Sequence, residues 1–192
     1  GADGAVPALV WGRCRIAGGA PAVAVSLTGR RRITFGGRRG GLLGRVLSLE
    51  LRVDLLEEVR RALGETPRPK ASSLRAVADC VVEALTLVEA AAPGAPVLLT
   101  CRTAAEGGRA VLDDTGYAGV MRLLLDELAA WEPRRRPAAV DIEVQRGCLP
   151  EVAARARDLG VDAAGSFHDF EGTPPDDDLE KVLNRMVQQG AD

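Results

Sequence analysis

Residues 46–54 read VLSLELRVD, and this stretch decides the fold class. Apolar and polar residues alternate along most of it, which is the two-residue period of a β-strand. Its charged side chains fall on one face: Glu50, Arg52 and Asp54. Two interpretations fit this pattern. The charged face is either the solvated side of an edge strand or the wall of a polar cavity that is reached from the carboxyl end of the strand.

Short apolar runs of the same kind alternate along the chain with longer amphipathic segments. We predict strands at residues 22–27, 46–53, 97–101, 139–144 and 162–167, and helices at 73–91, 117–131 and 149–159. Strands that alternate with helices in this way are typical of βαβ units, whose strands form a parallel sheet. The sequence therefore predicts an α/β protein with five such units.

Two connections stand out from this pattern. Residues 30–44 should hold a helix but contain five glycines, so we expect a short or irregular element there. A last helix is expected after Thr173 as N-cap, with Pro174 at its first position. The 3.6-residue spacing gives this helix an expected core face of four residues: Leu179, Val182, Leu183 and Met186.

The composition excludes several classes of function. A chain of 192 residues with 46% hydrophobic residues fits one soluble domain, and its net charge of −2 gives no bulk attraction to nucleic acid or to a membrane surface. The four cysteines form no C-x-x-C pair, which supports neither a zinc site nor a disulfide framework. Without a spanning segment or a secretory signal, we expect a cytoplasmic protein.

Polar residues also gather where the later predicted strands end. Arg102 follows the third strand and Glu106 lies in the loop after it, while Asp141 and Glu143 share one face of the fourth. Buried carboxylates have to be paired, so we expect the arginines of the second and third strands to be their partners. Because the carboxyl ends of parallel strands meet at one rim, these residues predict a charged site there.

His168 is the only histidine of the chain, and it lies where the fifth predicted strand ends. Histidine exchanges protons near neutral pH, so this position suits a general acid/base. The competing interpretation is a hydrogen-bonded structural histidine, because a single residue does not establish a site. The residues around His168 have to decide between the two.

Three motifs in order make the chain resemble type I 3-dehydroquinate dehydratase. They are E-x-R-x-D at residues 50–54, R-x-x-x-E-G-G at 102–108 and S-x-H-D-F-x-x-T-P at 166–174, together with AVSLTG at 24–29 and VDIE at 140–143. The resemblance implies a (β/α)8 TIM barrel, of which residues 1–192 would form one partial domain with about five of the eight βα units. It also implies an enzyme of the shikimate pathway that dehydrates 3-dehydroquinate to 3-dehydroshikimate.

The resemblance implies roles for individual residues. His168 would act as general acid/base and Glu106 would orient it. Four residues would bind the substrate: Ser26, Glu50, Arg52 and Arg102. The family forms an imine between a lysine and the substrate ketone, which acts as an electron sink, and it uses no metal and no other cofactor.

That lysine has no counterpart in the sequence. The only lysines are Lys70, in what we predict to be an exposed loop, and Lys181, on the expected solvent side of the last helix. In the family the lysine belongs to a sixth strand, which would follow Asp192. We therefore expect the sequence to be a piece of such an enzyme.

Two other functions remain as alternatives. One is a catalytically inactive remnant or interaction module of the same fold, which needs oligomerisation, such as a homodimer, to cover its open sheet edges. The other is a barrel lyase or aldolase that uses His168 without an imine. The second lacks support, because the sequence has neither H-x-H metal-ligand spacing nor a glycine-rich phosphate loop with lysine.

Overall fold

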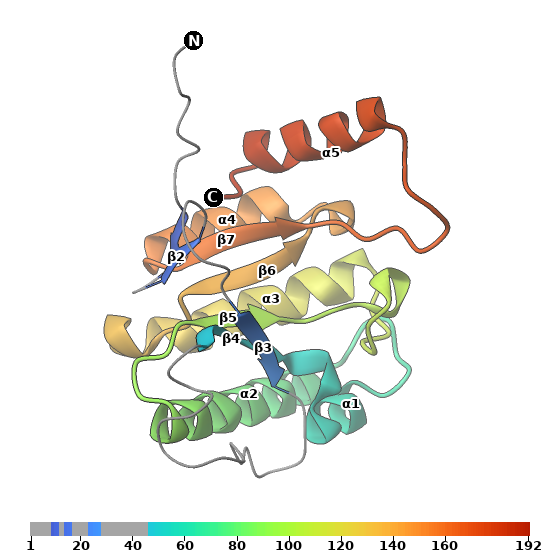
Figure 1. Cartoon of the computed structure of the whole chain (residues 1–192). Helices are drawn as coiled ribbons and strands as arrows, with labels where there is room; N and C mark the ends of the chain where they lie inside the picture. The colour runs from blue at the N-terminus through green and yellow to red at the C-terminus, as the bar shows by residue number, and fades with distance from the viewer. Residues whose placement is uncertain (1–8, 12–13, 17–22, 28–45) are drawn as a thin grey trace.

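The computed structural model describes residues 9–11, 14–16, 23–27 and 46–192, and Figure 1 shows their arrangement. The first two segments are the strands β1 (Leu9–Trp11) and β2 (Cys14–Ile16), which pair antiparallel and which we did not predict. The glycine-rich connection at residues 30–44 lies outside the described residues, and so does Ala22.

A parallel sheet of five strands forms the centre of the fold. Its order follows the chain, β3-β4-β5-β6-β7, and all four pairings are parallel. The strands are β3 (Val23–Leu27), β4 (Val46–Arg52), β5 (Val97–Thr100), β6 (Ala139–Glu143) and β7 (Asp162–Ser166). All five predicted strands are confirmed. Because β4 lies between β3 and β5, the edge-strand interpretation of residues 46–54 is wrong.

Three of the four longer helices cover one face of this sheet, as Figure 1 shows. They are α2 (Ala71–Ala91), α3 (Asp114–Ala129) and α4 (Leu149–Asp158), and each agrees with a predicted helix to within three residues. The short helix α1 (Glu57–Leu63) was not predicted, because seven residues carry too little periodicity. Leu49, Leu51 and Ile142 of the strands are buried in the core beneath these helices.

The strands end in short 3-10 turns that redirect the chain. These are η1 (Val53–Leu55) after β4, η2 (Ala104–Glu106) after β5 and η4 (Val144–Arg146) after β6, and a fourth, η3 (Pro133–Arg135), precedes β6. Val53 and Val144, which we assigned to strands, therefore belong to turns. Asp54 and Glu106 lie on these turns, and Arg52 and Glu143 directly precede two of them.

The last helix, α5 (Asp176–Gln188), differs from the prediction in two ways. It begins after Pro175, which is extended and takes the N-cap position in place of Thr173. The reason is that Pro175 disfavours helical geometry at Pro174, which precedes it. Of the expected core face, Val182 and Met186 pack against the core, whereas Leu179 and Leu183 are 37% and 61% exposed. Among the described residues, no helix is long and apolar enough to cross a membrane.

Candidate active site

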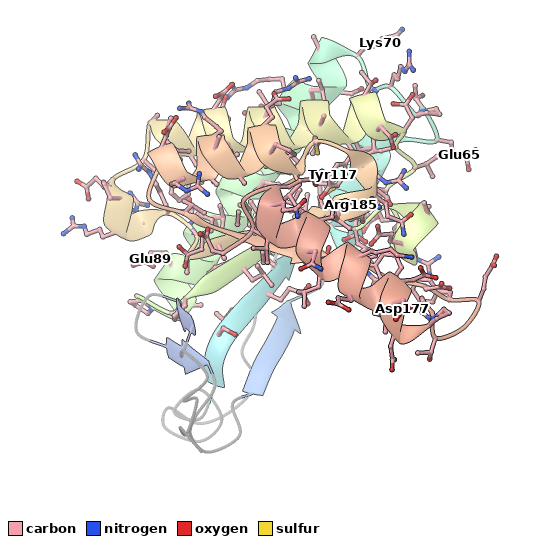
Figure 2. The ribbon with its side chains drawn as sticks, turned by 90° about the horizontal axis from the view of Figure 1, so that it is seen from above. Glu65, Lys70, Glu89, Tyr117, Asp177 and Arg185 are labelled. Atoms are coloured by element: carbon pink, nitrogen blue, oxygen red, sulfur yellow. The ribbon has the colours of Figure 1, made fainter. Side chains whose placement is uncertain are left out.

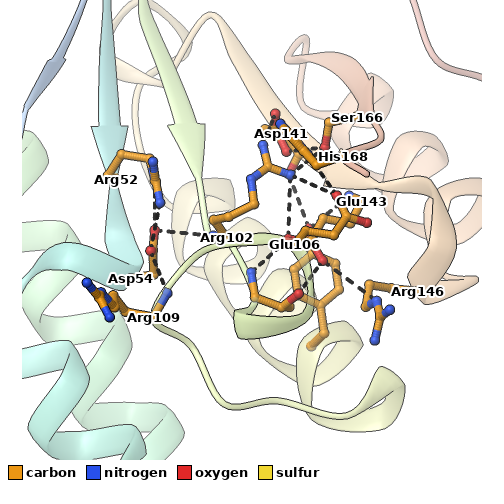
Figure 3. Close-up of polar contacts among 12 residues, drawn as sticks. Arg52, Asp54, Arg102, Glu106, Arg109, Asp141, Glu143, Arg146, Ser166 and His168 are labelled. Carbon is orange, nitrogen blue, oxygen red and sulfur yellow. Dashed lines mark hydrogen bonds and ion pairs between the residues drawn. The ribbon is translucent and has the colours of Figure 1, made fainter. Parts of the chain in front are cut away.

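Charged side chains from β4, β5, β6 and β7 converge at the carboxyl ends of these strands (Figure 3). This is the rim on which the sequence placed them. Arg102, Glu106, Asp141 and Glu143 are all buried. Charges that are this well shielded from water have to satisfy one another, so their contacts define the chemistry of the site.

Arg52 and Asp54 form a two-bond ion pair at the end of β4. Nε of Arg52 lies 2.9 Å from Oδ1 of Asp54 and Nη2 lies 2.9 Å from Oδ2. The carboxylate of Asp54 is 0% exposed and also accepts hydrogen bonds from the backbone N–H groups of Arg102 and Arg109. The hydrogen bond to Asp54 raises the pKa of Arg52. Asp54 thereby joins β4 to the loop after β5 and holds Arg52 in one orientation.

The guanidinium of Arg102 is the centre of a second network. Nη2 lies 2.9 Å from Oδ2 of Asp141, and Nη1 donates to Oγ of Ser166 at 2.7 Å. Nη1 is also 3.5 Å from carboxylate oxygens of both Glu106 and Glu143. Ser166 closes the network by donating to Oδ1 of Asp141 at 2.7 Å.

This network corrects one expectation from the sequence. Arg102 does neutralise the carboxylates of β6, but Arg52 pairs instead with Asp54 in the turn η1 that follows its strand. Burial raises the pKa of Asp141 and of Glu143, and in both cases the charge of Arg102 opposes that rise. One arginine therefore offsets much of the cost of burying several carboxylates.

Glu106 and His168 form a contact between a carboxylate and an imidazole. Nδ1 of His168 lies 2.9 Å from Oε2 of Glu106. Glu106 is buried, whereas the imidazole is 40% exposed. An ionised carboxylate only accepts hydrogen bonds, so in the pairing of a carboxylate with a neutral imidazole Nδ1 is the donor and Nε2 is the ring nitrogen that can accept a proton. The ring of Phe170 lies nearly parallel to the imidazole, with the ring centres 6.4 Å apart.

Some of the site residues predicted from the sequence contact one another at this rim, whereas others lie on the strands that lead to it. Arg102, Glu106 and His168 contact one another through the network, and Arg52 joins them through Asp54. Glu50 is half-buried in β4, and Ser26 is its backbone partner in β3, for which only the backbone is described. Both belong to the strands that lead to this rim.

The structure adds residues that we did not assign to the site: Ser166, Thr103, Tyr117 and Arg146. Ser166 belongs to the S-x-H-D-F motif, which was a signal for it. Tyr117 carried no such signal, because it resembles any apolar residue on the buried face of α3. Among the described residues, no group of three or more histidines, cysteines or acidic residues is arranged to hold a metal ion.

Neither lysine of the chain reaches this rim. Lys70 is exposed at the start of α2, and Figure 2 shows it at the edge of the molecule. Lys181 is 73% exposed and pairs with Asp178 at 2.7 Å. Both side chains therefore lie in water, as we predicted.

These features define a class: an α/β protein with a parallel sheet that carries a histidine–glutamate pair and paired charges at its strand ends. Type I 3-dehydroquinate dehydratase from Clostridium difficile has the same fold, with 20% sequence identity, a TM-score of 0.70, and coverage of 96% of this chain and 65% of that chain. The 3-dehydroquinate dehydratase from Enterococcus faecalis also has this fold, with 20% identity, a TM-score of 0.65, and coverage of 95% of this chain and 68% of that chain. The fold is that of TIM-barrel enzymes of this type.

Two curated relatives are 3-dehydroquinate dehydratases. The protein from Bacillus velezensis is 30% identical over 115 residues, which is 59% of this chain and 43% of the relative. The protein from Methanosarcina mazei is 30% identical over 146 residues, which is 75% of this chain and 50% of the relative. The chain thus spans about half the length of the curated relatives it matches. The sequence model of type I 3-dehydroquinase matches residues 45–192, and the chain belongs to that family.

Proposed function

We propose that this chain carries the proton-transfer part of a 3-dehydroquinate dehydratase, a carbon–oxygen lyase that removes water from 3-dehydroquinate in the shikimate pathway. The observation that carries the proposal is the contact between Glu106 and His168 at 2.9 Å, on a rim of paired charges. Residues 1–192 would then form one partial TIM-barrel domain. We further propose a cytoplasmic location without nucleic-acid or membrane partners, consistent with the net charge of −2.

In the proposed reaction, His168 carries one proton through two steps. Its Nε2 takes a proton from the carbon beside the imine, and the C–H electron pair is held as an enamine, with the imine nitrogen as electron sink. The C–O bond to the hydroxyl then breaks, the C=C double bond of the product forms, and the imine is restored. The same imidazole then delivers the proton to the departing hydroxyl, which leaves as water. Glu106 supports this by holding Nδ1–H and by stabilising the imidazolium between the two steps.

The other site residues would bind the substrate and balance its charges. Arg52 and Arg102 are suited to this because Asp54 and Asp141 hold their guanidinium groups in place before any substrate arrives. Ser26 and Glu50 would add hydrogen bonds to substrate hydroxyls from β3 and β4. No metal or other cofactor enters the proposal.

The imine-forming lysine would come from outside these residues, since Lys70 and Lys181 are both exposed. A trapping experiment tests this. The full product of the natural gene is treated with 3-dehydroquinate and borohydride, and the intact mass and the modified peptide are determined. We expect one covalent adduct on a lysine other than Lys70 and Lys181. Absence of an adduct together with absence of dehydration would overturn the proposal.

One observation favours the alternative of an inactive module that needs oligomerisation. Leu183 is 61% exposed and Val187 is 64% exposed on α5, which is much apolar surface for one short helix. Size-exclusion chromatography of the 192-residue chain separates the two functions. If the 192-residue chain is a dimer and neither this chain nor the full gene product is active, the inactive module is favoured. A folded monomer argues against the inactive module.

A further inference from the structure

We propose that Glu143 is a positioning residue for His168, which acts by holding the turn that carries Glu106. The inference rests on the proposed function, because it assigns Glu143 a part in the same proton transfer. Glu143 is the last residue of β6, and its carboxylate lies beside the loop after β5 (Figure 3). The contacts from β6 to the imidazole form an unbroken series.

The first contact joins Glu143 to Thr103. Oε1 of Glu143 accepts from the backbone N–H of Thr103 at 2.7 Å, and Oε2 accepts from the Thr103 hydroxyl at 2.6 Å. Both residues are 0% exposed, so water does not compete for these bonds. A carboxylate that accepts two hydrogen bonds from one residue fixes both its position and its orientation.

The second contact joins Thr103 to the turn η2. The carbonyl oxygen of Thr103 accepts from the backbone N–H of Glu106 at 3.1 Å and from that of Gly108 at 2.8 Å. The carbonyl oxygen of Thr103 thus holds both ends of the turn through backbone hydrogen bonds. Gly108 is required at this turn, because a Cβ there would collide with the carbonyl oxygen of Arg102. The side chain of Glu106 then reaches His168.

Glu143 is itself held from the helix layer and from the charges around it. Its backbone N–H donates to the hydroxyl of Tyr117 at 3.1 Å. Burial raises the pKa of Tyr117, so this group stays a neutral hydroxyl. Arg102 and Arg146 lie 3.5 and 3.6 Å from the carboxylate oxygens of Glu143 and neutralise its charge. Glu143 at the end of β6 therefore fixes the position of Thr103, and Thr103 in turn fixes the position of Glu106.

The test uses NMR on the 192-residue chain, in which His168 is the only histidine. Nitrogen-15 shifts of the imidazole report which ring nitrogen carries the proton. Wild type should show the proton on Nδ1, where Glu106 holds it. Thr103→Val removes the hydroxyl that Glu143 binds, and Glu143→Gln replaces one acceptor oxygen by an amide. Both should shift the proton population towards Nε2, in the same direction that we expect for Glu106→Gln.

Two variants serve as controls. Thr103→Ser keeps the hydroxyl and should retain the wild-type spectrum. Thr100→Val removes an equally buried hydroxyl that has no hydrogen-bond partner among the described residues, and it should change nothing. If Thr103→Val and Glu143→Gln fold and keep the wild-type tautomer while Glu106→Gln changes it, the inference is overturned.

Kinetics of the full gene product complete the test. For Glu143→Gln we expect kcat to fall about 100-fold with KM nearly unchanged, which is the loss typical of a misplaced catalytic group. The NMR result does not depend on dehydratase activity. If the Thr103 and Glu143 variants change the tautomer but the full gene product does not dehydrate 3-dehydroquinate, the positioning role of Glu143 is retained and the proposed function is contradicted. If the full gene product is active but these variants keep the wild-type tautomer, the proposed function is retained and the positioning role is contradicted.

Discussion

Loss of the His168 imidazole should abolish most of the chemistry and leave the fold intact. For His168→Ala in the full gene product we expect kcat to fall about 10²- to 10⁴-fold, the range for a lost general acid/base. The side chain is 40% exposed, so its removal should not change the far-UV circular dichroism or the unfolding midpoint. Glu106→Ala should lower kcat less and shift its pH profile. Unchanged turnover in His168→Ala would return this residue to a structural role.

Arg102 should matter for stability as much as for activity. Arg102→Met leaves the carboxylate of Asp141 buried without its ion-pair partner and removes one of the two arginines beside Glu143. We expect a loss of about 3–5 kcal/mol in the free energy of unfolding near neutral pH. Urea denaturation measures it. The exposed arginine of the Arg122–Glu151 pair is the matched control, because Arg122→Met should cost no more than about 1 kcal/mol.

The loss in Arg102→Met should also depend on pH in a defined direction. Burial raises the pKa of Asp141 and Glu143 in the folded state, so the folded protein takes up these protons at higher pH than the unfolded chain does. The cost of the buried charges is therefore absent below about pH 4 and increases as pH rises through the raised pKa values. An equal loss at about pH 4.5 and about pH 7.5 would contradict this account.

At the scale of the element, two glycines of α3 should respond to alanine in opposite directions. A Cβ at Gly119 meets open space, so Gly119→Ala should stabilise by about 0.5–1 kcal/mol through the better helix propensity of alanine. A Cβ at Gly116 would collide with the carbonyl oxygen of Pro67, so Gly116→Ala should destabilise by about 1–3 kcal/mol. Thermal unfolding of both variants checks the prediction, and equal shifts in Tm would contradict it.

The elements also show which sequence signals can be trusted. The alternation in residues 46–54 and the spacing of apolar residues in α2 located their elements correctly, because burial on one face imposes a period. The start of α5 was misplaced, because a single-residue capping signal at Thr173 was outweighed by the second proline, Pro175. Two of the four residues predicted for the core face of α5 are exposed, because amphipathic spacing does not tell how much of that face another element covers.

At the scale of the whole molecule, protection from hydrogen exchange should be uneven. Strands β5 and β6 have a hydrogen-bonded neighbour on each side, whereas α5 contains no buried residue. We expect the amides of α5 to exchange through local opening, well before those of β5 and β6. Helix α4, which is of similar length but buries Leu149 and Val152, is the control and should exchange slowly. Mass spectrometry of peptides measures this, and equal rates for α4 and α5 would contradict it.

The sequence by itself determined the parallel α/β architecture and the rim on which the charges gather, and it predicted His168, Glu106 and Arg102 as candidate site residues there. These follow from local patterns, since strand period and strand ends are properties of short segments. Only the tertiary structure decided the partners. Arg52 pairs with Asp54 in the turn after β4, Arg102 neutralises β6, and Glu143 binds Thr103. The partners of Arg102 and Glu143 come from segments that are far apart in sequence, and their choice depends on register and burial, which no single segment encodes.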